Sequence, residues 1–290
     1  MEARTLKQTI RDQCPGAYRL WCRLRYPQAW TIRSDLSGHL RILGRRILKL
    51  LHLDHRNPSM AAIKALKNRH SGERCFIVGT GASLTYEDLE KLKGETTFSM
   101  NSIFLTYKNT DWRPTYYAIV DYYGYENDLK QYIGENLGTY CLREIFLHYK
   151  IRPGALSGKE IHFLIHHGNH RSRRIRKKHF KQEAEISICI YDCFTVANMV
   201  LDIALYMGFQ EIYLIGIDCS YEQDKKHIEE TPADVRRRTD PDYLLPRIDL
   251  MKEGYNVLKK MAEKQGAVIY NATRGGNLDV FPRINFDDII

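Results

Sequence analysis

The sequence lacks a long apolar run, a leader segment and paired cysteines. No stretch approaches the roughly 18 consecutive apolar residues that a membrane-spanning helix needs. The first residues, MEARTLKQTIRDQCPGAYRL, contain no apolar segment followed by a small-residue cleavage site. The seven cysteines are scattered and form no C-x-x-C pair, which argues against a disulfide scaffold and a zinc knuckle. We therefore expect a cytoplasmic chain with reduced cysteines.

Acidic residues are scarce near the N-terminus, where basic residues are concentrated. Residues 1–52 contain eleven Lys or Arg and three Asp or Glu, so they carry most of the net charge of +9. Within them, HLRILGRRILKLLHL projects as an amphipathic helix, with Ile42 as the exception on its basic side. The apolar side consists of Leu40, Leu43, Ile47, Leu48, Leu50 and Leu51, and the basic side of Arg41, Arg45, Arg46 and Lys49.

This basic helix has two interpretations. It docks on an anionic lipid surface, or it packs on the body of the protein and leaves its basic side in solvent. A nucleic-acid partner is not favoured, because no aromatic-rich sheet motif or helix-turn-helix pattern accompanies the charge.

From about residue 71 onward, short apolar runs alternate with helical or turn-rich stretches, a pattern typical of α/β domains. The runs predict strands at 75–79, 96–101, 115–121, 144–149, 160–166, 185–192, 211–218 and 267–273, and helices at 85–93, 194–209 and 248–266. Strands separated by helices pack into a mainly parallel sheet. The sequence therefore predicts a basic helical extension over 1–70, followed by an α/β domain over 71–290.

The first predicted strand runs into a glycine turn, CFIVGTGASL. A dinucleotide fingerprint requires a third glycine where Leu84 stands and an acidic residue where the second strand ends in Asn101. A P-loop is excluded because no G-K-[ST] follows. Two interpretations remain. Gly79, Gly81 and Ser83 offer backbone N–H groups to a phosphate, or the turn is merely tight and Ser83 caps the next helix.

Polar residues end three of the predicted strands. Asn101, Asp121 and Asp218 each follow an apolar run, and the carboxyl ends of parallel strands form the edge at which open α/β sheets bind ligands. Each of them is alternatively a helix cap or a turn residue. Together with the glycine turn, they predict a nucleotide-binding site at this edge.

These motifs carry a resemblance. VGTGASL, SMNSIF, AIVDYY, the segment FTVANMVLDIALYMGFQEIYLIGIDCSY, His227 and the tail IYNATRGGNLDVFPRI resemble the 6-hydroxymethylpterin pyrophosphokinase (MptE)-like domain of bacteria and archaea. The resemblance covers residues 74–290 and implies a Rossmann-like sheet with flanking helices. The pattern is also similar to bacterial CMP-sialic-acid sialyltransferases of glycosyltransferase family 42. Thr80 and Asp121 stand where those enzymes have asparagines, which leaves the nucleotide open.

The resemblance implies a set of site residues. Nucleotide-binding candidates are Gly79, Thr80, Gly81, Ser83, Asn101, Thr195, Asp218 and Asn271. In the sialyltransferases, tyrosine hydroxyls stabilise the departing phosphate and a histidine deprotonates the acceptor. By position, Tyr221 and His227 take these roles here, and Asp121 is a further catalytic candidate.

Three functions follow as expectations. The first is a glycosyltransferase of surface glycan or polysaccharide assembly, which uses a nucleotide-sugar donor, a glycan or lipid-linked acceptor and no cofactor. The second is a pyrophosphokinase that transfers diphosphate from ATP to a pterin alcohol, with Mg²⁺ held by Asp121 and Asp218. The third is a nucleotide-binding module without catalysis.

Overall fold

The computed structural model describes residues 32–133, 140–156, 158–166, 185–191, 195–220, 227–232, 234–235 and 248–290. The chain divides into two compact units, Met1–Gly44 and Arg45–Ile290. In the first unit, the described residues form the N-terminal part of helix α3 (Ile32–Leu50). Among the described residues, no helix combines the length and apolar character that crossing a membrane requires.

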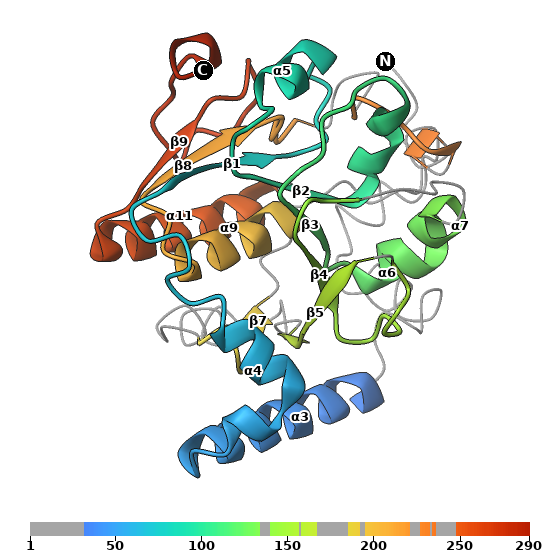
Figure 1. Ribbon diagram of the computed structural model, residues 1–290, viewed down its shortest axis with the longest axis vertical. Coiled ribbons are helices and arrows are strands. Elements are labelled where there is room, and N and C mark those ends of the chain that lie inside the picture. Colours follow the sequence, from blue (N-terminus) through green and yellow to red (C-terminus); the bar gives the residue numbers. More distant parts are fainter. Residues whose placement is uncertain are drawn as a thin grey trace, which may run out of the picture. The chain divides into compact units, whose positions relative to one another are not determined.

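The second unit contains a seven-stranded sheet in which all neighbouring strands are parallel (Figure 1). Its strand order is β5-β4-β3-β2-β1-β8-β9. The strands are β1 (Arg74–Val78), β2 (Thr97–Met100), β3 (Tyr116–Ile119), β4 (Glu144–His148), β5 (Lys159–Phe163), β8 (Glu211–Ile215) and β9 (Val268–Asn271). The predicted Rossmann-like α/β fold is confirmed.

Alternating side chains along each strand build a core on both faces of the sheet. In β1, Cys75 and Ile77 belong to the core that includes residues of α9 (Val196–Tyr206) and α11 (Ile248–Gln265). Phe76 and Val78 belong to the opposite core, which includes residues of α5 (Tyr86–Lys91). Figure 1 shows α9 and α11 together on one face of the sheet and α5 on the other. Because both faces are covered, most positions of the strands are apolar.

The remaining elements are short. They are a 3-10 helix at Asp54–Arg56, α4 (Pro58–Lys64), a 3-10 helix at Asn101–Lys108, α6 (Tyr122–Gly124), a π-helical segment at Tyr125–Leu129, α7 (Lys130–Ile133) and a 3-10 helix at Phe286–Asp288. The strand predicted at 185–192 is only β7 (Ile190–Tyr191), which pairs with β6 (Ile165–His166) in a separate small sheet. Residues 185–189 precede it without strand pairing, and three of them form a turn.

Helix α9 and strand β8 form the helix–turn–strand unit that their sequence predicts. Thr195 caps the start of α9, because its side chain accepts a hydrogen bond from the backbone N–H of Ala197 at 3.3 Å. Gly208 follows the helix with a φ of +89°, a left-handed conformation that glycine adopts readily and that ends helices. The chain then enters β8, which pairs with β1 in the middle of the sheet.

Candidate functional site

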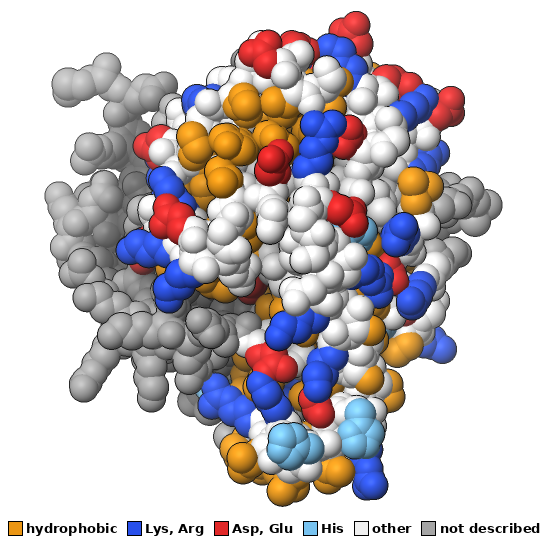
Figure 2. Space-filling model, turned by 60° about the vertical axis from the view of Figure 1, so that its left-hand side comes forward, with side chains coloured by type: hydrophobic (Ala, Val, Ile, Leu, Met, Phe, Trp, Pro, Cys, Tyr) orange, Lys and Arg blue, Asp and Glu red, His pale blue; other side chains and the backbone are white. Residues whose placement is uncertain are grey.

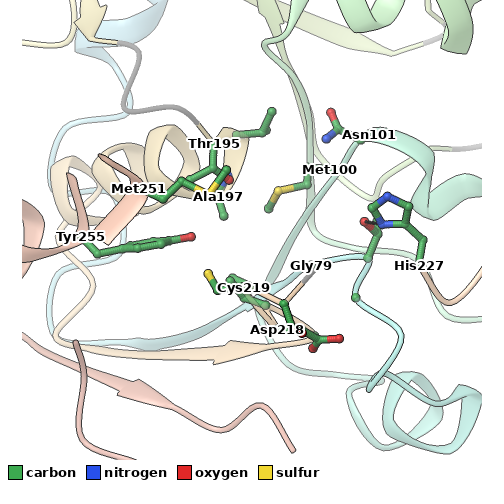
Figure 3. Close-up of a pocket in the computed structure, with 16 residues that line it drawn as sticks. Gly79, Met100, Asn101, Thr195, Ala197, Asp218, Cys219, His227, Met251 and Tyr255 are labelled. Atoms are coloured by element: carbon green, nitrogen blue, oxygen red, sulfur yellow. Dashed lines mark hydrogen bonds between the residues drawn. The ribbon is translucent and has the colours of Figure 1, made fainter. Parts of the chain in front are cut away.

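A pocket lies where the strand order of the sheet reverses. From β1, the chain builds β2 to β5 on one side, and it later adds β8 and β9 on the other side. In open α/β sheets, the carboxyl ends of the strands at this reversal form a ligand-binding crevice. The pocket is lined by Gly79, Thr80, Gly81, Met100, Asn101, Thr195, Val196, Ala197, Gly216, Ile217, Asp218, Cys219, Ser220, His227, Met251 and Tyr255 (Figure 3).

The pocket is small and has polar groups at one end. Its volume is about 150 Å³, below the roughly 300–1,000 Å³ of pockets that enclose whole small molecules. A ligand as large as a nucleotide would not fit entirely within the described walls. Met100, Met251 and Tyr255 contribute apolar surface, whereas Thr80, Asp218 and His227 contribute polar atoms.

The glycine turn packs against the end of β8. The N–H of Gly79 donates to the carbonyl of Ile215, and that of Gly81 to the carbonyl of Gly216, each at 2.8 Å. A Cβ atom added to Gly79 or Gly81 would lie 2.3 or 2.6 Å from the carbonyl oxygen of Gly216. The glycines are thus required because two backbone segments approach too closely for side chains.

Asp218 closes the same turn. Its carboxylate accepts hydrogen bonds from the N–H of Ser83, at 3.1 Å, and from the Ser83 hydroxyl. The N–H groups of Gly79, Gly81 and Ser83 therefore all donate to protein acceptors. A phosphate at this turn, which stays a prediction, would compete with these acceptors for the three N–H groups. The alternative role of Ser83, as the cap of the next helix, is wrong, since the N-cap of α5 is Thr85, which forms a capping box with Asp88.

His227 lies directly on the glycine turn, although 147 positions separate it from Thr80 in the chain. It forms an antiparallel bridge with Gly81, and the next residue, Ile228, donates its N–H to the carbonyl of Thr80 at 2.9 Å. The imidazole Nδ1 of His227 lies 3.0 Å from the Thr80 hydroxyl oxygen. The structure thus brings together two of the predicted site residues.

The segment after His227 is held to the domain by further contacts. Ile228 is buried. The carboxylate of Glu229 accepts hydrogen bonds from the Tyr86 hydroxyl and, at 3.3 Å, from the Asn109 side-chain amide. Burial, together with the neighbouring Glu229 carboxylate, raises the pKa of Tyr86 above its ordinary value, so its hydroxyl remains a donor at neutral pH. These contacts fix the backbone that carries His227.

Two helix starts also reach the pocket. Asn101 opens the 3-10 helix after β2 with a φ of +49°, a left-handed conformation that asparagine tolerates better than most residues. Its side-chain oxygen is buried without a hydrogen-bond partner among the described atoms. Thr195, Val196 and Ala197 place the N-terminus of α9 at the wall, where backbone N–H groups and the helix dipole favour negative charge.

Sequence reasoning missed the residues that α11 contributes. Met251 and Tyr255 occupy apolar positions of a periodic helix and are both buried, so nothing in their local sequence separates them from ordinary core residues. In Figure 3 the Tyr255 hydroxyl extends toward the interior of the pocket. Cys219 was also missed. Burial raises the pKa of its thiol to about 11, which keeps it protonated and unsuited to act as a nucleophile.

Among the candidates that the structure describes, Ser83, Asp121 and Asn271 do not line the pocket. Asp121 is exposed, and its carboxylate accepts a hydrogen bond from the N–H of Gly124 at 3.0 Å. This contact matches the alternative in which Asp121 is a cap or turn residue. Asn271 is 1% exposed and holds the C-terminal segment: its side chain donates to the carbonyl of Leu278 and accepts from the N–H of Thr273. Tyr221, which follows Ser220 in the sequence, lies outside the described residues.

The positions of Asp121 and Asp218 concern the Mg²⁺ site that the two carboxylates were predicted to form. Asp218 lines the pocket and Asp121 does not, so the two carboxylates do not form the predicted Mg²⁺ site within it. Across the described ranges, no cluster of three or more His, Cys, Asp and Glu side chains is arranged to hold a metal ion.

Comparison with known proteins identifies the family. The family model described as 6-hydroxymethylpterin diphosphokinase MptE-like matches residues 50–224, more than half of the chain. The chain belongs to this MptE-like family. The MptE-like match includes the glycine turn, Asn101 and Asp218, and it ends before His227. No curated protein sequence matches the chain.

Two solved structures share a low level of similarity with this MptE-like protein. A MAf glycosyltransferase from Magnetospirillum magneticum AMB-1 is 15% identical with a TM-score of 0.47, over 80% of this chain and 38% of the other. The monofunctional alpha-2,3-sialyltransferase Cst-I from Campylobacter jejuni is 17% identical with a TM-score of 0.42, over 76% of this chain and 83% of the other. The chain thus spans well under half of the first structure. TM-scores this low support no conclusion about activity.

Proposed function

We propose that this protein is a transferase that binds a nucleotide in the pocket at the strand-order reversal and transfers a sugar from a nucleotide-activated donor to a glycan hydroxyl. The observation that carries this proposal is the position of His227, which lies on the glycine turn with its Nδ1 atom next to the Thr80 hydroxyl. Such a transfer requires a base for the acceptor hydroxyl and a stabilised leaving phosphate.

The Thr80 contact orients the imidazole for the role of base. When Nδ1 carries the proton and donates a hydrogen bond to the Thr80 hydroxyl oxygen, the lone pair of Nε2 is available to accept a proton. Nε2 then accepts the proton of the acceptor hydroxyl as the hydroxyl oxygen bonds to the anomeric carbon. The bond from that carbon to the donor phosphate breaks, and its electrons leave with the nucleotide. The N-terminus of α9 supports the phosphate charge.

A second candidate is the diphosphokinase that the family description names. It transfers diphosphate from ATP to a pterin alcohol, a reaction for which His227 is equally suited as the base. Phosphoryl transfer from ATP depends on Mg²⁺ that bridges the phosphates. The separation of Asp121 from the pocket disfavours this candidate, because the two predicted carboxylates do not meet in the pocket.

A ligand panel distinguishes these functions. The protein is heated with CMP, CDP, UDP, GDP or ATP, each with Mg²⁺ and with chelator. A ligand at a hundred times its Kd stabilises the native state by about 2.7 kcal/mol, which raises Tm by roughly 5–10 °C in a domain of this size. We expect a shift with one of the nucleoside mono- or diphosphates that persists in chelator. A shift with ATP alone, lost in chelator, would favour the diphosphokinase.

The base assignment is tested by His227→Ala. We expect turnover to fall roughly 10²–10⁴-fold while the Tm shift with nucleotide is retained, since the base acts on the acceptor. Thr80→Val should lower turnover and Thr80→Ser should restore it, because only a hydroxyl orients Nδ1. His39→Ala, at an exposed histidine outside the pocket, is the matched control. Full activity in His227→Ala would refute the assignment. Nucleotide binding without transfer of sugar or diphosphate would indicate a binding module.

A further inference from the structure

The C-terminal end of α3 exposes apolar side chains. In the second unit, Ile47, Leu50 and Leu51 are 47%, 78% and 57% exposed. These residues belong to the apolar side of the amphipathic helix, and the interpretation in which this side packs on the protein does not hold for them. Residues 46–56, here called the α3 tip, comprise the last turns of α3 and the 3-10 helix at Asp54–Arg56.

The α3 tip is held firmly on its inner side. The guanidinium of Arg45 donates to the carbonyls of Ser187 and Ile188 at 3.1 and 3.2 Å, and Lys49 forms an ion pair with Glu185. These contacts orient the last turns of α3 on the second unit. The exposure of Leu50 and Leu51 is therefore a property of an anchored helix end.

Basic residues outnumber acidic ones in the α3 tip. Its basic residues are Arg46, Arg56 and Lys49, of which Lys49 pairs with Glu185, and His52 and His55 lie beside them in the sequence. Its single carboxylate, Asp54, is buried and paired with Lys64. Figure 2 shows basic and histidine side chains next to hydrophobic ones at this end of the domain. Exposed apolar side chains with basic residues nearby are the combination that binds anionic membrane interfaces.

We propose that the α3 tip docks the protein on an anionic phospholipid surface, with Ile47, Leu50 and Leu51 inserted at the level of the headgroups. A second copy of the chain is a poorer occupant. A stable interface between proteins buries about 800 Å² on each partner, far more than three side chains provide. A lipid surface needs no such area, because shallow insertion and attraction between cations and anionic headgroups act together. The proposal is independent of the transferase function.

Vesicle flotation tests the docking. The full-length protein is mixed with vesicles of phosphatidylcholine alone or of phosphatidylcholine with phosphatidylserine, at low and high salt. We expect binding only to the phosphatidylserine vesicles, weakened by salt. Leu50→Glu/Leu51→Glu should lower the apparent affinity at least about 10-fold, because it removes the apolar insertion and adds repulsion. The matched control is Leu142→Glu, at a residue that is 68% exposed outside the tip, and it should bind as the wild type does.

A second measurement does not depend on loss of binding. Tryptophan introduced by Leu50→Trp should shift its emission to the blue when phosphatidylserine vesicles are added, and Leu142→Trp should not. Equal vesicle binding by the wild type and Leu50→Glu/Leu51→Glu would overturn the proposal. So would self-association of the wild type, abolished by the double substitution, without any binding to vesicles, because the tip would then join two copies of the chain.

Discussion

At Gly81, the backbone passes so close to the end of β8 that no side chain fits. An added Cβ would lie 2.6 Å from the Gly216 carbonyl oxygen and 2.7 Å from the Asp218 carboxyl group. We expect Gly81→Ala to lower the free energy of unfolding by roughly 1–3 kcal/mol, as overpacking does, and to displace Asp218 from Ser83. Urea denaturation measures this. Gly44→Ala is the control, because no atom lies within 4 Å of its added Cβ. Equal stability of both variants would contradict the close approach.

Single residues were the hardest feature to predict from the sequence. Gly79, Thr80, Gly81 and Asp218 lie in the pocket wall at the sheet edge where the sequence places them, because a glycine turn and a strand end have local signatures. Ser83 and Asn271 carry the same local signatures, yet their side chains form hydrogen bonds within the protein. Which partner satisfies a polar side chain depends on segments far away in the chain, and this information is absent from a short motif.

Among the elements, β4 and β5 are joined at their amino ends by one buried carboxylate. Glu144 accepts hydrogen bonds from Arg69 at 2.8 Å and from Lys159 at 3.0 Å. Burial raises the pKa of Glu144, but the bonds from Arg69 and Lys159 outweigh it and leave the pKa below its ordinary value. A carboxylate with a lowered pKa stabilises the folded state above its unfolded pKa of about 4.3, and this contribution is lost as the pH falls through the folded pKa.

We therefore expect Glu144→Gln to destabilise the protein by about 1–3 kcal/mol at neutral pH. The difference from the wild type should shrink below about pH 4, where the wild-type carboxyl also becomes protonated. Chemical denaturation over a pH series measures both effects. Glu126→Gln removes an exposed i,i+4 pair with Lys130 and should cost less than about 0.5 kcal/mol. A difference that stays constant down to low pH would show that the ionised form of Glu144 contributes nothing.

The elements themselves were largely predictable. Strands buried on both faces are rich in apolar residues, so β1, β2, β3, β4 and β8 stand out in the sequence. The apolar run at 185–192 has the same composition but pairs over only Ile190–Tyr191, because pairing depends on what lies beside a segment. The short helices that follow Asn101 and Asp121 have no long apolar period and were not predicted.

At the scale of the whole molecule, two boundaries differ in position. The composition of the sequence changes near residue 71, whereas the compact unit begins at Arg45. Residues of α4 and the turn after it explain the difference. Met60, Ile63 and Leu66 are fully buried, and Ile63 and Leu66 belong to the same core as α9 and α11. The family match, which begins at residue 50, also includes α4. The sequence does not reveal that α4 belongs to the core, because the N-terminal region is dominated by basic residues and a few core residues change its composition only slightly.

Truncation tests where the folded unit begins. A chain that starts at residue 71 lacks Met60, Ile63 and Leu66, and the loss of each large buried side chain costs about 2–5 kcal/mol. Together these losses are comparable with the total stability of a domain, about 5–15 kcal/mol. We expect the fragment Arg45–Ile290 to unfold in one cooperative transition near the Tm of the full chain, and the fragment 71–290 to show no such transition by circular dichroism. Cooperative unfolding of 71–290 at an unchanged Tm would mean that α4 covers the core without stabilising it.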